Sequence, residues 1–186
     1  MTIKDVLIMS ASMLGREDVV NYLNGKLQAV GEDTEPTVNL LVNLLNLVIS
    51  ELSATFIPMI KTEKVAVNSG KIFYSNLKEN AIRIIKVYDN NGNEMSTKQT
   101  AEYIAVSGTS ATVEYEYAPA NYGLSDVIGY TPKEVGVSTL AYGLNAEYSI
   151  SRGNFEEAVM WHKRYVDSVS ELRKVKNVTV KERSFV

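Results

Sequence analysis

Apolar residues recur at intervals of three and four along the first third of the chain, and this spacing predicts helices. The first stripe consists of Ile3, Val6, Leu7 and Met13. Thr2 precedes the stripe and can serve as the N-cap of its helix. A second, short helix is expected over residues 16–23. Gly25, which follows it, can end this helix.

The strongest helical pattern begins at Thr34 and ends before Pro58, which lacks the backbone N–H that a continuing helix needs. Pro36 falls in the first turn, where a missing N–H is tolerated. The apolar positions are Val38, Leu41, Val42, Leu45, Val48, Ile49, Leu52 and Phe56. The stretch is long enough to cross a bilayer, but asparagines and a glutamate interrupt it. We therefore predict a buried helix and no membrane association.

Uncharged polar residues form a narrow stripe on this third helix. They are Asn39, Asn43, Asn46, Ser50 and Ser53. Such a stripe is either the solvent-facing edge of a mostly buried helix or a contact with another protein. Asn39, Asn43 and Asn46 are therefore candidates for a subunit interface.

Between residues 61 and 117 the apolar period shortens towards two, as expected of strands. Three strand–turn–strand units are predicted, with turns at NSG (68–70), NNG (90–92) and SGTS (107–110). Oxygen-bearing side chains around NNG alternate as in a calcium loop, but the glycine comes too early for an EF-hand, so a hairpin turn is expected. The stretch predicts an antiparallel β insertion.

Two further helices are predicted after the insertion, joined by a very short connection. Thr131 and Glu134 have the spacing of a capping box, with proline at the first helical position. Gly153 is expected to end this helix in the left-handed conformation. Asn154 and Glu157 are placed to begin the next one. The two segments predict an antiparallel helical hairpin.

Together these elements predict an α+β fold: an antiparallel helical bundle with an inserted antiparallel β-hairpin unit. The bundle comprises residues 1–58 and 131–174, and the insertion comprises residues 59–118. A chain of 186 residues suits a single domain over residues 1–174. Residues 175–186 depart from the helical pattern and are predicted to form an extended C-terminal tail.

The last predicted helix contains the only tryptophan and the only histidine of the chain, Trp161 and His162. Its apolar stripe is Phe155, Ala158, Val159, Tyr165, Val166, Val169 and Leu172. At 100° per residue His162 falls in the middle of this stripe, so we predict that it faces the interior. Trp161 flanks the stripe and is expected in the core, with Lys163 and Arg164 turned away from it.

For His162 the sequence leaves three roles open: a hydrogen-bonded core or interface residue, a pH-sensitive contact, or a catalytic group. Catalysis is disfavoured, because general acid–base chemistry needs a second polar group within reach and the neighbours on the helix face are apolar or tyrosine.

The sequence contains no motif that indicates another kind of catalytic or metal-binding site. The chain has no cysteine, which excludes disulfides, a thiolate nucleophile and cysteine-based zinc sites. The GxSxG motif and the glycine-rich phosphate loops are absent. Paired carboxylates are explained by a helix N-terminus and an exposed strand face. No catalytic, cofactor-binding or metal-binding residue is predicted.

The net charge of −3 is unevenly distributed. Residues 161–186 carry seven Lys and Arg against three Asp and Glu, or +4, which leaves −7 for residues 1–160. A basic C-terminal end on an acidic body suggests a binding partner for that end.

Several motifs distributed over nearly the whole chain are similar to those of one known family. They are MTIKDVLIMSASMLGREDVVNYL at the start, LLNLVISELSATFIPM, IRIIKVYDNNGNE, VEYEYAP and LAYGLNAEYSISRGNFEEAVMWHKRY. The last has the form A-x-G-x-x-x-E-Y, a short turn, and F-E-E-A-x-x-W-x-x-x-Y. With the order of elements, they resemble the head-tail adaptor (head completion, or connector) proteins of tailed bacteriophages.

The resemblance implies a structural virion protein at the head-tail junction, assembled in the host cytoplasm. Twelve copies would form a ring between the portal protein and a tail or stopper protein, with double-stranded DNA passing through the lumen without sequence specificity. The family has no catalytic residues or cofactors to transfer. An acidic body agrees with a lumen that does not bind DNA, since cationic side chains would bind phosphate.

In this family such C-terminal tails bind the portal. The resemblance therefore makes portal-binding candidates of Lys176, Val178, Val180, Lys181, Arg183 and Phe185. A disordered tail is the alternative. The alternative function is a small regulator that binds nucleic acid or protein through the basic C-terminus, and an enzyme ranks third. For lack of a strong apolar patch outside the helices, the isolated protein is expected to be monomeric.

Overall fold

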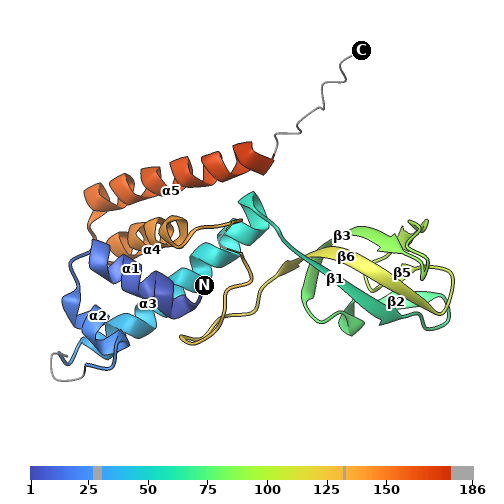
Figure 1. The fold of residues 1–186 in the computed structure, drawn as a ribbon, viewed down its shortest axis with the longest axis horizontal. Coiled ribbons are helices and arrows are strands. Elements are labelled where there is room, and N and C mark those ends of the chain that lie inside the picture. Colours follow the sequence, from blue (N-terminus) through green and yellow to red (C-terminus); the bar gives the residue numbers. More distant parts are fainter. Residues whose placement is uncertain (27–30, 132, 177–186) are drawn as a thin grey trace, which may run out of the picture. The chain divides into compact units, whose positions relative to one another are not determined.

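The computed structural model describes residues 1–26, 31–131 and 133–176, and the chain divides into two compact units (Figure 1). Unit 1, Met1–Glu51 with Asn121–Val186, contains the α-helices. They are α1 (Ile3–Met13), α2 (Glu17–Leu23), α3 (Thr34–Glu51), α4 (Val137–Ser151) and α5 (Phe155–Lys176). Unit 2, Leu52–Ala120, contains the strands. Helices combined with antiparallel sheets agree with the predicted α+β class.

The N-terminal helix begins as its sequence predicts. The Thr2 hydroxyl oxygen accepts a hydrogen bond from the backbone N–H of Asp5 at 3.2 Å, and the Asp5 carboxylate accepts one from the Thr2 N–H at 2.7 Å. This reciprocal pair is a capping box, which satisfies N–H groups that have no partner inside the helix. The predicted role of Thr2 is confirmed.

A polar cluster connects α2 to α3 and α4. The Arg16 guanidinium donates to both carboxylate oxygens of Asp18 at 2.9 and 2.8 Å and to the Tyr148 hydroxyl at 2.8 Å. The Thr34 hydroxyl donates to the same carboxylate at 3.1 Å. The bond from Arg16 lowers the pKa of Asp18 well below its ordinary value, outweighing the effect of partial burial.

This cluster predicts a pH dependence of stability. Because the folded-state pKa of Asp18 is depressed, its contribution is fully present above its ordinary pKa of about 4 and is lost as the pH falls below that. We expect Asp18→Asn to cost about 1 kcal/mol at pH 7 and to reduce the loss of stability between pH 5 and pH 2, because the pair is only half-buried. Urea unfolding at several pH values measures both; an unchanged acid slope in the variant would contradict the assignment.

Helix α3 forms the centre of the core of unit 1. Its buried side chains include Val38, Leu41, Leu45, Val48 and Ile49, and it packs against α1, α2 and α4. A π-helical turn, η2 (Leu52–Phe56), continues it before Pro58. By length and composition alone, Thr34–Phe56 could cross a membrane. The apolar side chains of this stripe are buried against neighbouring helices of the same unit.

Helix α4 begins later than predicted. Thr131 and Glu134 do form a side-chain-capped turn, with the Thr131 N–H donating to the Glu134 carboxylate at 2.9 Å. The helix itself begins at Val137, because Gly136 is extended (φ −75°, ψ 155°) and interrupts the helical conformation. At the other end the prediction is confirmed: Gly153 adopts φ +77°, and the Asn154 N–H donates to the Ser149 carbonyl at 2.8 Å.

Two small antiparallel sheets make up unit 2. In the first, β1 (Met59–Ala66), β6 (Ser110–Ala118) and β3 (Asn80–Tyr88) lie in the order β1-β6-β3. In the second, β2 (Lys71–Phe73), β5 (Tyr103–Ala105) and β4 (Lys98–Gln99) lie in the order β2-β5-β4. A 3₁₀ turn, η3 (Tyr74–Asn76), follows β2.

Two of the three predicted hairpins are wrong in their pairing. The hairpin at NNG forms only briefly, with the Asp89 N–H donating to the Asn93 carbonyl at 2.9 Å and the Met95 N–H to the Val87 carbonyl at 2.8 Å. NSG closes a tight turn with an isolated Asn68–Lys71 bridge, and a Tyr88–Glu94 bridge flanks NNG. The strands beyond these turns then separate: β1 and β3 pair with β6, and β2 pairs with β5. The reason is burial, because β6 is the central strand and buries alternate side chains, among them Val113 and Tyr115, in the unit's core.

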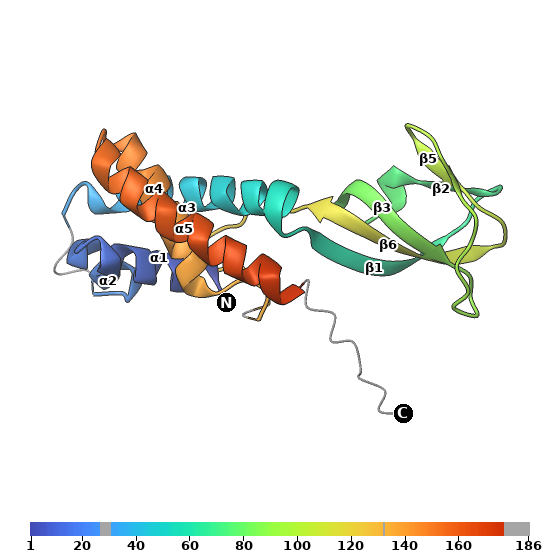
Figure 2. The same cartoon turned by 90° about the horizontal axis from the view of Figure 1, so that it is seen from above.

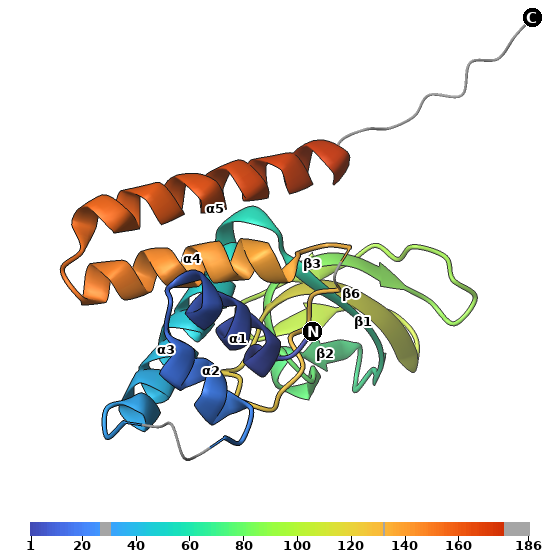
Figure 3. The ribbon, with the colours of Figure 1, turned by 60° about the vertical axis from the view of Figure 1, so that its left-hand side comes forward.

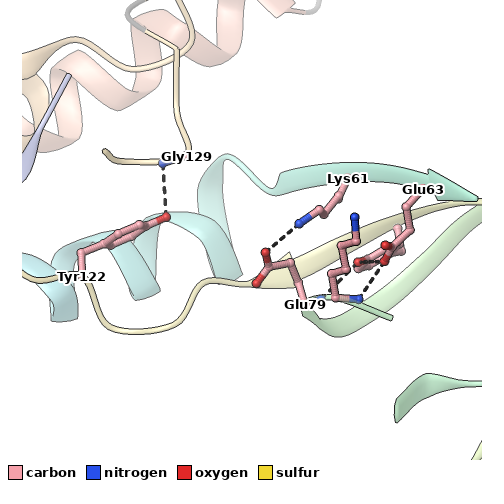
Figure 4. Close-up of polar contacts among 7 residues, drawn as sticks. Lys61, Glu63, Glu79, Tyr122 and Gly129 are labelled. Atoms are coloured by element: carbon pink, nitrogen blue, oxygen red, sulfur yellow. Dashed lines mark hydrogen bonds and ion pairs between the residues drawn. The ribbon is translucent and has the colours of Figure 1, made fainter. Parts of the chain in front are cut away.

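Polar contacts fix the edge of the first sheet (Figure 4). Lys61 on β1 donates to the Glu79 carboxylate at 2.7 Å, and the Glu63 carboxylate accepts from the Lys78 N–H at 2.8 Å. The buried Tyr115 donates its hydroxyl to Glu63 at 2.6 Å, and burial raises the pKa of this tyrosine. These bonds hold the segment before β3 against β1.

Candidate interaction surface

Helix α5 carries two adjacent stripes of largely apolar residues, one buried and the other exposed. Ala158, Trp161, Tyr165 and Val169 are buried. Phe155, Val159, His162 and Val166, named here the α5 stripe, are exposed. The fractional exposures of Phe155 and Val159 are 66% and 70%, values that are unusual for large apolar side chains aligned on one helix face.

The buried stripe packs against α4, which runs alongside α5 (Figures 1 and 3). The Trp161 ring stacks on Tyr142 with centroids 6.0 Å apart. Gly143 provides the room for Tyr165, since a Cβ at that position would lie 3.1 Å from the tyrosine ring. The Thr139 and Ser168 hydroxyls are hydrogen-bonded at 2.6 Å. This interface accounts for the aromatic and small residues of the helical hairpin.

Trp161 lies in the core as predicted, with 5% of its surface exposed. Its indole N–H donates to the Glu157 carboxylate at 3.1 Å. The prediction that Arg164 turns away is wrong: the guanidinium carbon lies 4.9 Å from the centroid of the Trp161 ring. Residues three apart are neighbours on a helix surface, so Arg164 reaches over the Trp161 ring and makes a cation–π contact with it.

The prediction that His162 faces the interior is also wrong, because the side chain is exposed. The apolar positions of α5 cover an arc wider than one neighbouring helix can bury. Helix α4 takes the part centred on Trp161 and Tyr165, and His162 lies beyond it, with its ring 6.4 Å from that of Tyr165. No helix of unit 1 covers His162 within the described residues.

The α5 stripe continues onto the end of α4. Ile150, with 48% of its surface exposed, lines a shallow groove together with the stripe. Lys163 and Asp167 border the groove. Seen from above, α5 lies over α4 on the outside of the helical unit (Figure 2). The surface is apolar in its middle and charged at its edge, which is the composition of a protein-binding surface.

The asparagine stripe of α3 is divided between two roles. Asn39 and Asn43 are exposed, and their place in a subunit interface stays a prediction. Asn46 instead binds the segment that follows unit 2: its carboxamide oxygen accepts from the Tyr122 N–H at 2.7 Å and its NH₂ donates to the Tyr122 carbonyl at 2.9 Å. The Tyr122 hydroxyl in turn accepts from the Gly129 N–H at 3.2 Å (Figure 4).

The predicted portal-binding tail lies mostly outside the described residues. This holds for Val178, Val180, Lys181, Arg183 and Phe185. Lys176 is the last residue of α5, so the predicted boundary between body and tail at residue 175 is two residues too early.

No metal-binding group of side chains is found in the part of the chain that the structure describes. No three His, Asp or Glu side chains there are grouped so that they could hold a metal ion. At the NNG turn, the Asp89 carboxylate accepts from the backbone N–H groups of Asn91 and Asn93 at 2.8 and 2.9 Å. These bonds lower the pKa of Asp89 and stabilise the turn, in agreement with the hairpin turn predicted at NNG.

Comparison with known proteins adds no relative. No protein-family model matches the chain, and no curated protein matches it. The functional assignment therefore depends on the α5 stripe and on the motifs of the sequence.

Proposed function

We propose that this chain is a structural component of a virion, the head-tail adaptor that its motifs resemble. The α5 stripe carries the proposal. A folded subunit that leaves Phe155, Val159 and Val166 exposed on one helix gains stability when another protein covers that face, at about 25 cal/mol for each Å² buried. Such a surface suits a part of an assembly.

The motifs behind the resemblance have a physical meaning in this fold. Gly143 and Tyr148 of A-x-G-x-x-x-E-Y, and Ala158, Trp161 and Tyr165 of F-E-E-A-x-x-W-x-x-x-Y, lie in the core of unit 1. The spacing is what the packing of α4 on α5 requires. The motifs therefore support a shared helical hairpin, and the proposal extends this likeness to the shared role.

Under this proposal about twelve copies form a ring between the portal protein and a tail or stopper protein, and double-stranded DNA passes through the lumen. The role needs shape and contact surfaces, and no catalytic group or cofactor. The acidic balance of residues 1–160 supports a lumen that does not retain DNA, because acidic side chains outnumber the cationic ones that could bind phosphate.

The proposal predicts that truncation after Lys176 weakens binding to the portal without destabilising the body. The helical core ends before this point, so we expect the thermal midpoint to change by less than about 2 °C. Lys181 and Arg183 attract an acidic surface, so the loss of binding to purified portal rings should be larger at low salt. Co-sedimentation at two salt concentrations measures it; equal binding of both chains would refute a portal-binding tail.

The alternative, a regulator that binds nucleic acid, is favoured by the cluster of Lys and Arg near the C-terminus. A titration of duplex DNA separates the two functions. A regulator binds tightly, with an affinity that falls steeply on a log–log plot against salt, whereas the adaptor binds weakly. Electron microscopy of the protein mixed with portal rings then shows whether it adds a ring of density.

A further inference from the structure

The α5 stripe is symmetric about its own midpoint. Phe155 and Val166 are the same distance in sequence from a point between residues 160 and 161, and so are Val159 and His162. All four lie within an arc of about 60° at 100° per residue. If a second α5 is laid antiparallel on the first, Phe155 meets Val166 at both ends, and Val159 meets His162 twice in the middle.

The charges at the edge of the groove agree with this arrangement. A two-fold rotation brings one edge of the stripe against the same edge in the other copy. Lys163 of each copy and Glu156 of the other are then separated by only about 3 Å along the helix axis. Both residues are exposed, so their charges attract across the edge of the contact.

The neighbouring helix fits the same geometry. Ile150 of α4 lines the groove at the end where Phe155 lies. In the antiparallel pair that end faces Val166 of the other copy, so Ile150 adds apolar contact there. An interface of this kind is isologous: each copy contributes the same surface, and the pair closes on itself.

We propose that a second copy of this chain covers the α5 stripe, forming an antiparallel dimer of α5 helices about a two-fold axis near residues 160 and 161. This replaces the monomer expected from sequence, because that expectation considered only apolar patches outside the helices. The inference does not depend on the adaptor role. A ring needs head-to-tail contacts, so a closed dimer is a separate state of the free protein.

Disulfide trapping tests the register directly, because the natural chain has no cysteine. Phe155→Cys and Val166→Cys are each made alone, with tags of different mass, then mixed and oxidised. Two copies of residue 155 lie about 16 Å apart along the axis in the proposed dimer, too far for a disulfide, while 155 and 166 lie level. We expect the mixed species and little of either self-linked species; a predominance of self-linked species, or no cross-link, overturns the arrangement.

Light scattering with a matched pair of variants tests the surface without cysteines. Val159→Lys places a charge in the middle of the stripe, whereas Met160→Lys makes the same change at a side chain that is 44% exposed and about 100° away. We expect the wild type to be dimeric at micromolar concentration, Val159→Lys to raise the dissociation constant at least about tenfold, and Met160→Lys to leave it within about twofold. A monomeric wild type, or equal effects of the two variants, overturns the proposal.

Discussion

Replacing Trp161 by alanine is expected to lower the free energy of unfolding by about 3–5 kcal/mol, the usual cost of removing a large buried aromatic side chain. The ring is 5% exposed and stacks on Tyr142, so its loss leaves a cavity between α4 and α5. The contacts with Glu157 and Arg164 are lost as well. Urea unfolding followed by circular dichroism measures the change, since the variant has no tryptophan fluorescence.

The adjacent residue is the control for this experiment. His162→Ala changes an exposed side chain, so we expect a change within about 0.5 kcal/mol. It is measured below the concentration at which the protein associates, so that loss of a dimer contact does not contribute. A cost for His162→Ala comparable with that of Trp161→Ala would contradict the observed exposure of His162 and favour the interior position predicted from the sequence.

Replacing Gly143 by valine is expected to cost about 3 kcal/mol or more, the upper part of the range for overpacked cores. A Cβ at this position would lie 2.7 Å from Cγ1 of Val48 on α3 and 3.1 Å from the ring of Tyr165 on α5. Both neighbours belong to packed helices, so α4 must shift or the side chains must leave their rotamers. Thermal unfolding measures the loss.

A double-mutant cycle identifies the contact responsible. Gly143→Ala adds only the Cβ, and Val48→Ala removes the Cγ1 atom that it would meet. Alanine favours a helix over glycine by about 1 kcal/mol, so in the Val48→Ala background the substitution at residue 143 should become less costly or even stabilising. The same cost in both backgrounds would mean that contact with Val48 does not limit this position.

The sequence predicted the elements of unit 2 better than their pairing. Turn residues such as Asn68 and Gly70 do form tight turns, because their backbone conformations are set locally. Which strands then pair depends on burial across the whole unit. Val113 and Tyr115 of β6 are fully buried, and a central position with partners on both edges accomplishes that burial. Local hairpin signals carry no information about such distant partners.

The candidate surface was only half visible in the sequence. Periodicity placed Phe155, Val159, His162 and Val166 on one apolar face of the helix, and they do share one face. It could not say how much of that face a neighbour covers. The width of the apolar arc was the signal available, because one antiparallel neighbour cannot bury all of it.

By itself, the sequence determined the local conformations of this protein: the capping box at Thr2, the left-handed end of α4 at Gly153 and the helical phase of α5. These depend on backbone sterics and on side chains a few residues apart. Only the tertiary structure decided that His162 is exposed, that Asn46 binds the chain's own backbone, and that β6 lies between β1 and β3. The physical reason is that burial depends on which surfaces meet, and those surfaces come from residues far apart in the chain.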